Sequence, residues 1–426
     1  MGQQQTNPAS NPVSGQSGDE RAIVRPARPA LDAAVSALAA VLLKRVLESI
    51  GNPGLRFVLW NGDEIPRHRD AKSGRILIHD MAALLRLVAN PAMNFGEMYA
   101  SRRIDVQGDL PELLEQVYRA LPREDGVTDK RLRLGAWLDA QRHSLRQARN
   151  NIRHHYDFGN DFYKLWLDRE MIYTCAYFPA PAIDLESAQR AKMQHICRKL
   201  RLKPGEKVIE AGCGWGAMAL HMARQHGVSV QAYNISREQI SFARERARQE
   251  GFGAQVKFIE DDYRNARGKF DAFVSVGMLE HVGPERYEEL GHLIDGVLAD
   301  HGRGLIHSIG RDYPQALNAW TERRIFPAAC PPSLSQMMNI FEPCGFSVLD
   351  VENLRLHYAK TLEHWLQRFE ANAAAVEAMF DPTVARTWRL YLAGSLAAFR
   401  AGNMQLFQVL FARSRDNRIP WTRDAP

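Results

Sequence analysis

The sequence predicts an α/β protein whose main domain holds a doubly wound sheet, with a smaller α/β domain before it. Three observations support this prediction: a glycine-rich turn between a strand and a helix at residues 208–216, strands that alternate with helices up to residue 306, and polar residues at the ends of these strands. We place a disordered tail at 1–30, the small domain at 31–122, a linker with a basic helix at 123–149 and the main domain at 150–426.

Composition narrows the class of protein. The chain has 426 residues, 45% of them hydrophobic, and a net charge of +6, which fits a soluble protein with an anionic partner, either nucleic acid or an acidic phospholipid surface. Its five cysteines are scattered without a C-x-x-C pair, so we expect no disulfide framework, no metal site and a reducing cytoplasm. The longest apolar run, 33–43, is shorter than the ~20 residues that span a bilayer. We therefore predict no transmembrane helix, and no signal peptide in the polar first thirty residues.

The small domain begins with an amphipathic helix over 31–50, which either packs on the residues that follow or lies on a membrane. Strands are predicted at 55–60 and 75–78, and helices at 81–88 and 110–121. A polar linker leads into a basic stretch between Lys130 and Arg153. This stretch is either a solvated helix face or a docking surface for phosphate head groups.

The turn at the start of the main domain constrains the cofactor. A strand enters at Val208, glycines follow at Gly212, Gly214 and Gly216, and a helix begins at about Ala217. The G-x-G-x-G spacing differs from the dinucleotide fingerprint G-x-G-x-x-G, and no phosphate-binding G-x-x-x-x-G-K-[ST] motif occurs. The loop fits S-adenosylmethionine better, because that cofactor has no phosphate to hold. The alternative interpretation is a tight turn without a ligand.

Four further strands are predicted at 228–233, 256–259, 272–276 and 304–306. A capping box, Ser236 to Gln239, opens the helix after the second of the five strands. A glycine or a polar residue stands at the carboxyl end of every strand: Gly212, Asn234, Asp262, Glu280 and His307. Because doubly wound sheets bind ligands beyond this edge, we expect these residues to line one site.

Several segments resemble one family, the cyclopropane-fatty-acid-phospholipid synthases and their mycolic acid relatives. The resemblance runs from about residue 150 to 412 in unbroken order. It rests on His155–Tyr163, Tyr173–Phe178, Glu186–Gln189, Gly212–Gly216, Ser275–Gly283, Ile325–Pro327 and Ala398–Arg400. The small domain resembles the N-terminal extension of the phospholipid-acting branch.

This resemblance implies a class I methyltransferase (Rossmann-like) sheet with helical additions that bind an acyl chain. It implies that S-adenosylmethionine contacts Tyr173, Thr174, Gly212, Gly214, Gly216, Asn234, Gln239, Asp262 and Tyr263. It also implies a bound bicarbonate among Cys175, Glu280, His307, Ile309 and Tyr358, which form the expected catalytic set. No resident metal is implied.

The implied reaction transfers a methylene group to the cis double bond of an unsaturated phospholipid acyl chain. Alkylation of the double bond leaves a carbocation, so the site must exclude water and supply a base, the bicarbonate, that removes a proton as the ring closes. The rival within the family is C-methylation that gives a methyl- or methylene-branched chain. Rivals of another class are a nucleic acid methyltransferase and a non-catalytic lipid-binding protein. We expect a cytoplasmic enzyme at the inner face of the membrane, with a homodimer as one possibility and no nucleic acid partner.

Two further expectations concern the acyl chain. The acceptor pocket is predicted near residues 320–338 and among the aromatic and apolar residues of the C-terminal helices, which alternatively form only a helical core: Trp365, Phe369, Trp388, Tyr391, Leu396 and Phe399. Many family members have a cysteine where this chain has Ser395. Serine is the weaker nucleophile, so we expect no covalent catalysis from this position.

Overall fold

The computed structural model describes residues 29–66, 74–122, 158–420 and 422. The predicted tail, apart from its last two residues, lies outside this part of the chain, as do the linker, the basic stretch and residues 155–157 of the first resembling segment. Within the described residues, no helix combines the length and the apolar character that crossing a membrane requires.

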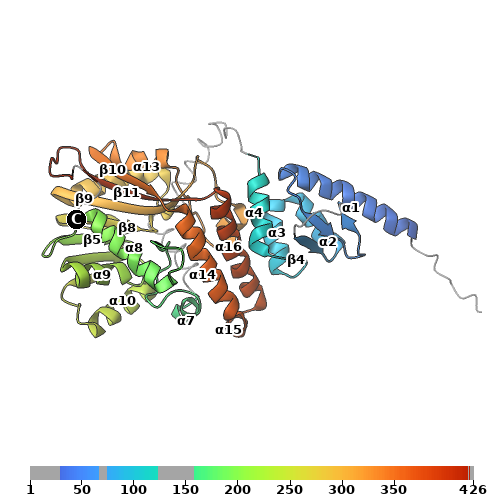
Figure 1. Cartoon of the computed structure of the whole chain (residues 1–426), viewed down its shortest axis with the longest axis horizontal. Helices are drawn as coiled ribbons and strands as arrows, with labels where there is room; N and C mark the ends of the chain where they lie inside the picture. Colours follow the sequence, from blue (N-terminus) through green and yellow to red (C-terminus); the bar gives the residue numbers. More distant parts are fainter. Residues whose placement is uncertain (1–28, 67–73, 123–157, 421, 423–426) are drawn as a thin grey trace, which may run out of the picture.

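The N-terminal unit is a four-stranded sheet covered by helices (Figure 1). Its elements are α1 (Pro29–Ser49), β1 (Arg56–Val58), β2 (Glu64–Ile65), β3 (Arg75–Ile78), α2 (Met81–Ala89), α3 (Pro91–Ala100), β4 (Ile104–Gln107) and α4 (Leu110–Ala120). The strand order is β2-β1-β3-β4. Leu43 of α1 is fully buried against Leu55 and Phe57, so this helix packs on the domain that follows it. The sequence did not predict β2, α3 or β4, which are short and have a weak apolar pattern.

The second unit is built on a seven-stranded sheet in the order β10-β11-β9-β8-β5-β6-β7. Its strands are β5 (Lys207–Ala211), β6 (Ser229–Asn234), β7 (Val256–Glu260), β8 (Phe270–Val276), β9 (Leu298–Gly310), β10 (Phe346–Asn353) and β11 (Gln405–Arg413). The five predicted strands, β5 to β9, pair in parallel. The sheet is mixed at one edge, because β11 is antiparallel to both β9 and β10.

Helices cover both faces of this sheet. They are α8 (Leu185–Leu200), α9 (Ala217–His226), α10 (Arg237–Gln249), α11 (Tyr287–Val297) and α13 (Leu334–Phe341). Ile196, Leu220 and Ile240 of α8, α9 and α10 pack in one core with strand residues. Ile294 and Ile340 of α11 and α13 pack in another. The arrangement is the doubly wound α/β fold that the alternation of strands and helices predicted.

Further helices belong to the second unit. They are α7 (Asn160–Lys164), α12 (Ala319–Arg324), α14 (Arg355–Ala371), α15 (Ala373–Met379) and α16 (Pro382–Ala401). Two of them, α12 and α16, contact the N-terminal unit. Figure 1 shows α16 between α14 on one side and α3 and α4 of the N-terminal unit on the other. Arg386 of α16 donates to a carboxylate oxygen of Asp105 at 2.6 Å, and its guanidinium lies over the ring of Tyr99. Gly96 of α3 allows close contact, because a Cβ atom there would lie 2.4 Å from the ring of Trp320. The two units therefore share a tight interface.

Candidate active site

The five residues predicted at the strand ends lie along the carboxyl edge of the sheet. Gly212 follows β5, and Asn234 is the last residue of β6. Asp262 and Glu280 lie in the turns after β7 and β8. His307 is inside β9, which is longer than predicted, but it pairs with Val276, the last residue of β8. Strand register therefore brings His307 level with the others.

The three glycines of the loop have different reasons to be glycine. All have positive φ, at +85°, +52° and +88° for Gly212, Gly214 and Gly216. A Cβ atom at Gly212 would lie 2.9 Å from Met278, and one at Gly216 would lie 2.6 Å from Phe258, so packing excludes side chains there. At Gly214 no atom lies within 4 Å of the Cβ position. The backbone of Gly214 is therefore the part of the loop that a cofactor can approach closely.

Two buried amides support this loop from the second strand. The Asn234 side-chain nitrogen donates to Gln239 Oε1 at 2.7 Å and to the Gly214 carbonyl at 3.3 Å. The predicted cofactor residues Asn234 and Gln239 are thus held together beside the loop. The carboxylate of Asp262, a third predicted cofactor residue, is held by an arginine. Arg264 donates to both of its oxygens, at 2.8 and 2.9 Å. Burial raises the pKa of the neighbouring Tyr263 phenol.

Tyr173 and Thr174 help to line the main cavity, and the ring of Tyr173 packs on Tyr163, which packs on Trp215 of the glycine loop. Lys192 of α8 donates from Nζ to Thr174 Oγ1 at 2.7 Å, and Gln189 donates to the Thr174 carbonyl at 2.9 Å. Lys192 is only 2% exposed, and burial lowers its pKa to about 8. Sequence reasoning missed Lys192, because lysine on an amphipathic helix usually faces solvent. The sequence did offer one indication: Lys192 lies three residues after Gln189, on the same face of the helix as that residue of the resembling segment.

Glu280 and His307 each present one buried polar atom without a hydrogen-bond partner. Glu280 Oε1 accepts the Ile309 N–H at 2.6 Å, whereas its Oε2 has no partner among the described residues. His307 Nδ1 lies 3.0 Å from the amide nitrogen of Gln408, and His307 Nε2 has no partner in that part of the chain. An amide nitrogen donates, so Nδ1 accepts and the ring proton is on Nε2. Burial raises the pKa of Glu280 to about 7 and holds the pKa of His307 well below its usual value.

These two atoms fit a small anion that carries a hydroxyl group. The neutral His307 can donate from Nε2, and the Glu280 carboxylate can accept from the hydroxyl, which is the pattern that bicarbonate offers. A buried polar atom without a partner is costly, so both atoms favour a ligand in the cavity that the two residues line. The residues present therefore fit the expected anion. Gln408, which sets the tautomer of His307, was not predicted.

The remaining catalytic candidates line the same cavity. Cys175 is fully buried, and burial raises the pKa of its thiol, which therefore stays neutral. Tyr358 of α14 packs its ring against Phe399, with 4.6 Å between centroids. All five predicted members of the catalytic set, Ile309 included, border one cavity.

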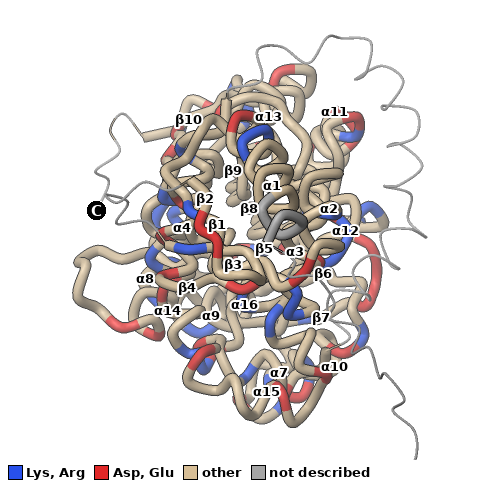
Figure 2. The backbone as a smooth tube through the Cα atoms, turned by 90° about the vertical axis from the view of Figure 1, so that its right-hand side faces the viewer, with Lys and Arg blue, Asp and Glu red and all other residues tan. Residues whose placement is uncertain are grey.

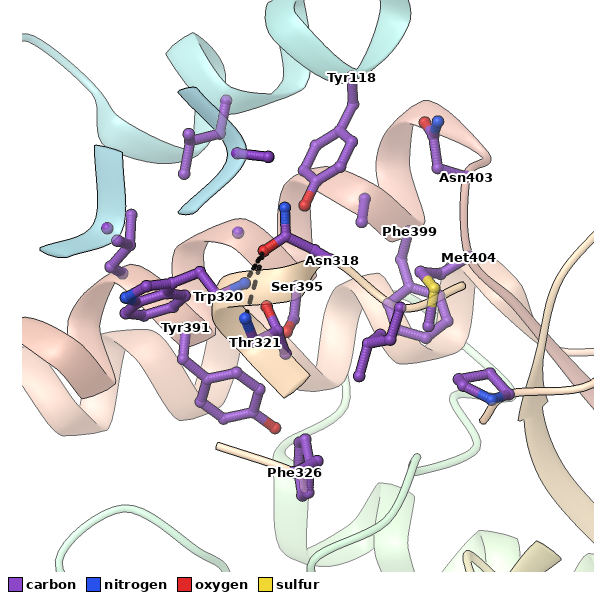
Figure 3. Close-up of a pocket in the computed structure, with 18 of the residues that line it drawn as sticks. Tyr118, Asn318, Trp320, Thr321, Phe326, Tyr391, Ser395, Phe399, Asn403 and Met404 are labelled. Atoms are coloured by element: carbon purple, nitrogen blue, oxygen red, sulfur yellow. Dashed lines mark hydrogen bonds between the residues drawn. The ribbon is translucent and has the colours of Figure 1, made fainter. Parts of the chain in front are cut away.

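This cavity has a volume of about 440 Å³ and walls from both units. Figure 3 shows Tyr118 of α4 pointing toward the segment with Asn318 and Trp320, opposite Tyr391 of α16. Its apolar lining extends into the N-terminal unit, where it includes Val46, Leu55, Phe57, Ile76, Leu87 and Leu113. The cavity includes part of the region predicted to hold the acyl chain, near 320–338 and the C-terminal helices. Trp320, Phe326, Tyr391 and Phe399 line the cavity, whereas Trp365, Phe369, Trp388 and Leu396 are packed core. The contribution of the N-terminal unit was not predicted.

Comparison with known proteins identifies the family. The family model of mycolic acid cyclopropane synthetase matches residues 143–409, more than half of the chain. The chain belongs to this family. Residues 42–123 match a second model, a domain of unknown function.

The chain is similar to a cyclopropane-fatty-acyl-phospholipid synthase of Escherichia coli, with 40% identity over 62% of this chain and 68% of the relative. A probable fatty acid methyltransferase of Pseudomonas putida is 34% identical over 90% of this chain and 98% of the relative. Among solved structures, a mycolic acid cyclopropane synthase complexed with SAH and CTAB aligns with 62% of this chain and 98% of its own, at 29% identity and a TM-score of 0.59. The chain is therefore an S-adenosylmethionine-dependent methyltransferase with the class I fold.

One group of potential metal ligands lies outside the cavity lining. The ligand atoms of Cys197, His221 and His226 lie within 4.8 Å of one another. Gln194 Oε1 is 3.3 Å from Nε2 of both histidines, so it can accept a hydrogen bond from either ring. A metal would have to displace these hydrogen bonds to bind the two nitrogens. We assign no metal to this cluster.

Proposed function

We propose that this enzyme transfers a methylene group from S-adenosylmethionine to the cis double bond of an unsaturated phospholipid acyl chain, which forms a cyclopropane ring. One observation carries the proposal. One cavity with largely apolar walls is lined by Tyr173 and Thr174 and by Glu280 and His307, and each of the last two has a buried polar atom without a partner among the described residues. An acyl chain in this cavity would place its double bond between the methyl donor and the anion site.

The cofactor supplies the methyl group, and bicarbonate supplies the base. The side chains of the protein provide the surroundings that this chemistry needs. The apolar walls exclude water from a carbocation in the acyl chain. The aromatic face of Tyr358, packed on Phe399, favours the positive charge. His307 and Glu280 would hold the anion in a fixed orientation, and a bicarbonate held there would supply the base that ring closure needs.

A second candidate is C-methylation, which gives a methyl- or methylene-branched chain. The similarity to a fatty acid methyltransferase over nearly the whole chain favours it. Both reactions begin with alkylation of the double bond and differ only in the fate of the cation. An anion held by Glu280 and His307 would favour loss of a proton, and hence the ring or the methylene product.

The N-terminal unit is the part that we propose to contact the membrane. Leu38 and Val41 of α1 are each 53% exposed, and Leu85 of α2 is 51% exposed. Figure 2 views this end of the molecule and shows Lys and Arg interspersed with Asp and Glu. The exposed apolar side chains therefore offer a clearer route to the bilayer than net charge does. This arrangement fits a cytoplasmic enzyme at the inner face of the membrane.

Expression in a bacterial host that lacks cyclopropane fatty acids tests the function. Mass spectrometry of the extracted phospholipids should show acyl chains heavier by about 14 mass units, and NMR should show ring protons. A gain of about 16 units, or olefinic methylene protons, would establish the branched product instead. Release of S-adenosylhomocysteine with unsaturated liposomes distinguishes an enzyme from a non-catalytic binding protein. Turnover with nucleic acid but not with lipid would contradict the proposal.

A further inference from the structure

Arg311 is a buried cation without a partner. It is 6% exposed and lines the main cavity. Its Nε has no hydrogen-bond partner, and in the described part of the chain no carboxylate lies within ion-pair distance of its guanidinium. The neighbouring Asp312 is exposed. An unpaired charge is costly to bury, so the site is built for an anion that the chain itself does not provide.

Arg311 lies next to the strand that holds two of the candidate catalytic residues, His307 and Ile309. It directly follows β9, and its N–H donates to the Pro332 carbonyl at 2.8 Å, which extends the strand geometry beyond Gly310. Side chains two residues apart on a strand share a face, so His307, Ile309 and Arg311 line the same cavity. Four residues of strand place the Cα atoms of His307 and Arg311 about 13 Å apart.

The surroundings of Arg311 indicate the entrance side of the cavity. The lining continues from Arg311 to Gln315, which is half-buried, and to Asn318, which is exposed. Tyr118 of α4 lines the same cavity from the N-terminal unit, and burial raises the pKa of the Tyr118 phenol. Arg311 therefore lies between the solvent-facing side of the cavity and the catalytic residues, with polar groups around it.

We propose that Arg311 binds the phosphodiester of the phospholipid substrate. A guanidinium suits phosphate because it donates two parallel hydrogen bonds. With the phosphate at Arg311, the acyl chain runs inward along β9 and its middle reaches His307. The position of the double bond that reacts would then be measured from the head group. This inference rests on the proposed function, since it takes the substrate to be a phospholipid.

Binding of ligands that cannot react separates this inference from the proposed function. The probes are palmitoyl-lysophosphatidylglycerol, monopalmitoylglycerol without phosphate, and palmitate, titrated by calorimetry in the presence of S-adenosylhomocysteine. The wild-type chain should bind the phosphate-containing probe most tightly. Arg311→Gln should weaken that binding roughly ten- to hundredfold and leave monopalmitoylglycerol binding within about twofold. Arg311→Lys, which keeps the charge, should recover part of the difference.

The control is Arg323→Gln, which removes the same charge from an exposed position on α12 and should change neither affinity. S-adenosylhomocysteine binding reports that each variant is folded. An equal loss of affinity for both lipid probes in Arg311→Gln would overturn the inference, because it indicates a structural role. A loss confined to palmitate would also overturn it, because the anion would then be a carboxylate. Phosphate-dependent binding without turnover of unsaturated phospholipid would contradict the proposed function and support the phosphate site.

Discussion

The hydroxyl oxygens of Tyr173 and Tyr391 lie 2.8 Å apart. Tyr173 belongs to the segment beside the cofactor loop, and Tyr391 to α16, the helix that contacts the N-terminal unit. Both rings line the main cavity. This hydrogen bond therefore links the expected cofactor end of the site to the helix that forms its wall, so that a change at the unit interface can reach the cofactor.

Replacement of Tyr391 tests this link. Tyr391→Phe keeps the ring that packs on Phe326 and Trp388 but removes one partner of the hydrogen bond. We expect the Kd for S-adenosylhomocysteine to rise about two- to tenfold, with little change in melting temperature, because a neutral hydrogen bond contributes about 1 kcal/mol. Calorimetry measures the affinity. An unchanged Kd would show that Tyr173 does not depend on this bond to hold the cofactor.

Gln408 should act on catalysis by setting the tautomer of His307. In Gln408→Glu the new carboxylate accepts from Nδ1–H, which leaves Nε2 without its proton and unable to donate to an anion. We expect kcat to fall at least about tenfold while the affinity for S-adenosylhomocysteine is kept. Gln408→Asn, a neutral amide, serves as the comparison for the shorter side chain. Equal activity of the glutamate variant and the wild type would contradict the assigned tautomer.

Glu280 should make stability depend on pH. Burial raises its pKa from 4.5 to about 7, so between these values the folded protein keeps a proton that the unfolded chain releases. The free energy of unfolding therefore falls as pH rises from 4.5 to 7, by about 3 kcal/mol for this group alone. Glu280→Gln cannot ionise and should be more stable relative to the wild type at pH 7.5 than at pH 4.5. Urea unfolding at several pH values measures this, with the exposed Glu238→Gln as control. A constant difference between Glu280→Gln and the wild type would contradict the burial argument.

Local patterns were sufficient to predict much of the sheet and its active edge. Glycine turns and β-branched runs marked β5 to β8, and the carboxyl ends of those strands located Asn234 and Glu280. The antiparallel strand β11 was not predicted, because it follows α16 in sequence and inserts between β9 and β10. Gln408 was missed for the same reason, since only the pairing of β11 with β9 places it opposite His307.

The burial of charged side chains could not be predicted from the sequence either. Nothing in the pattern around Lys192 or Arg311 distinguishes them from the many exposed basic residues of this chain. Their burial depends on contacts between distant elements, such as α8 against the segment with Thr174. The wall that the N-terminal unit gives to the cavity likewise depends on the packing of α4 and α16. Deleting residues 1–122 to test membrane docking would remove this wall, so point substitutions are the better test.

Membrane contact through α1 is testable with such substitutions. Leu38 and Val41 are three residues apart, share the exposed face of the helix and are each 53% exposed. We expect the double change Leu38→Glu and Val41→Glu to weaken binding to anionic vesicles about tenfold or more, because two apolar side chains leave the bilayer and two negative charges approach it. Sedimentation with vesicles measures binding. Leu356→Glu, at a residue 62% exposed on α14, is the matched control. An equal loss of vesicle binding in both variants would show that added negative charge anywhere on the surface weakens binding, and would contradict a specific contact through α1.

Ser395 should be dispensable for turnover. It lines the cavity from α16, and a nucleophilic serine would need a base to take its proton. None of the hydrogen bonds among the described residues joins the Ser395 hydroxyl to such a base. Ser395→Ala removes one oxygen and no packing carbon, so we expect more than about half of kcat to remain. Steady-state release of S-adenosylhomocysteine with unsaturated vesicles measures it, with His307→Ala as the inactive reference. A loss of turnover as large as that of His307→Ala would mean that the serine takes part in the reaction.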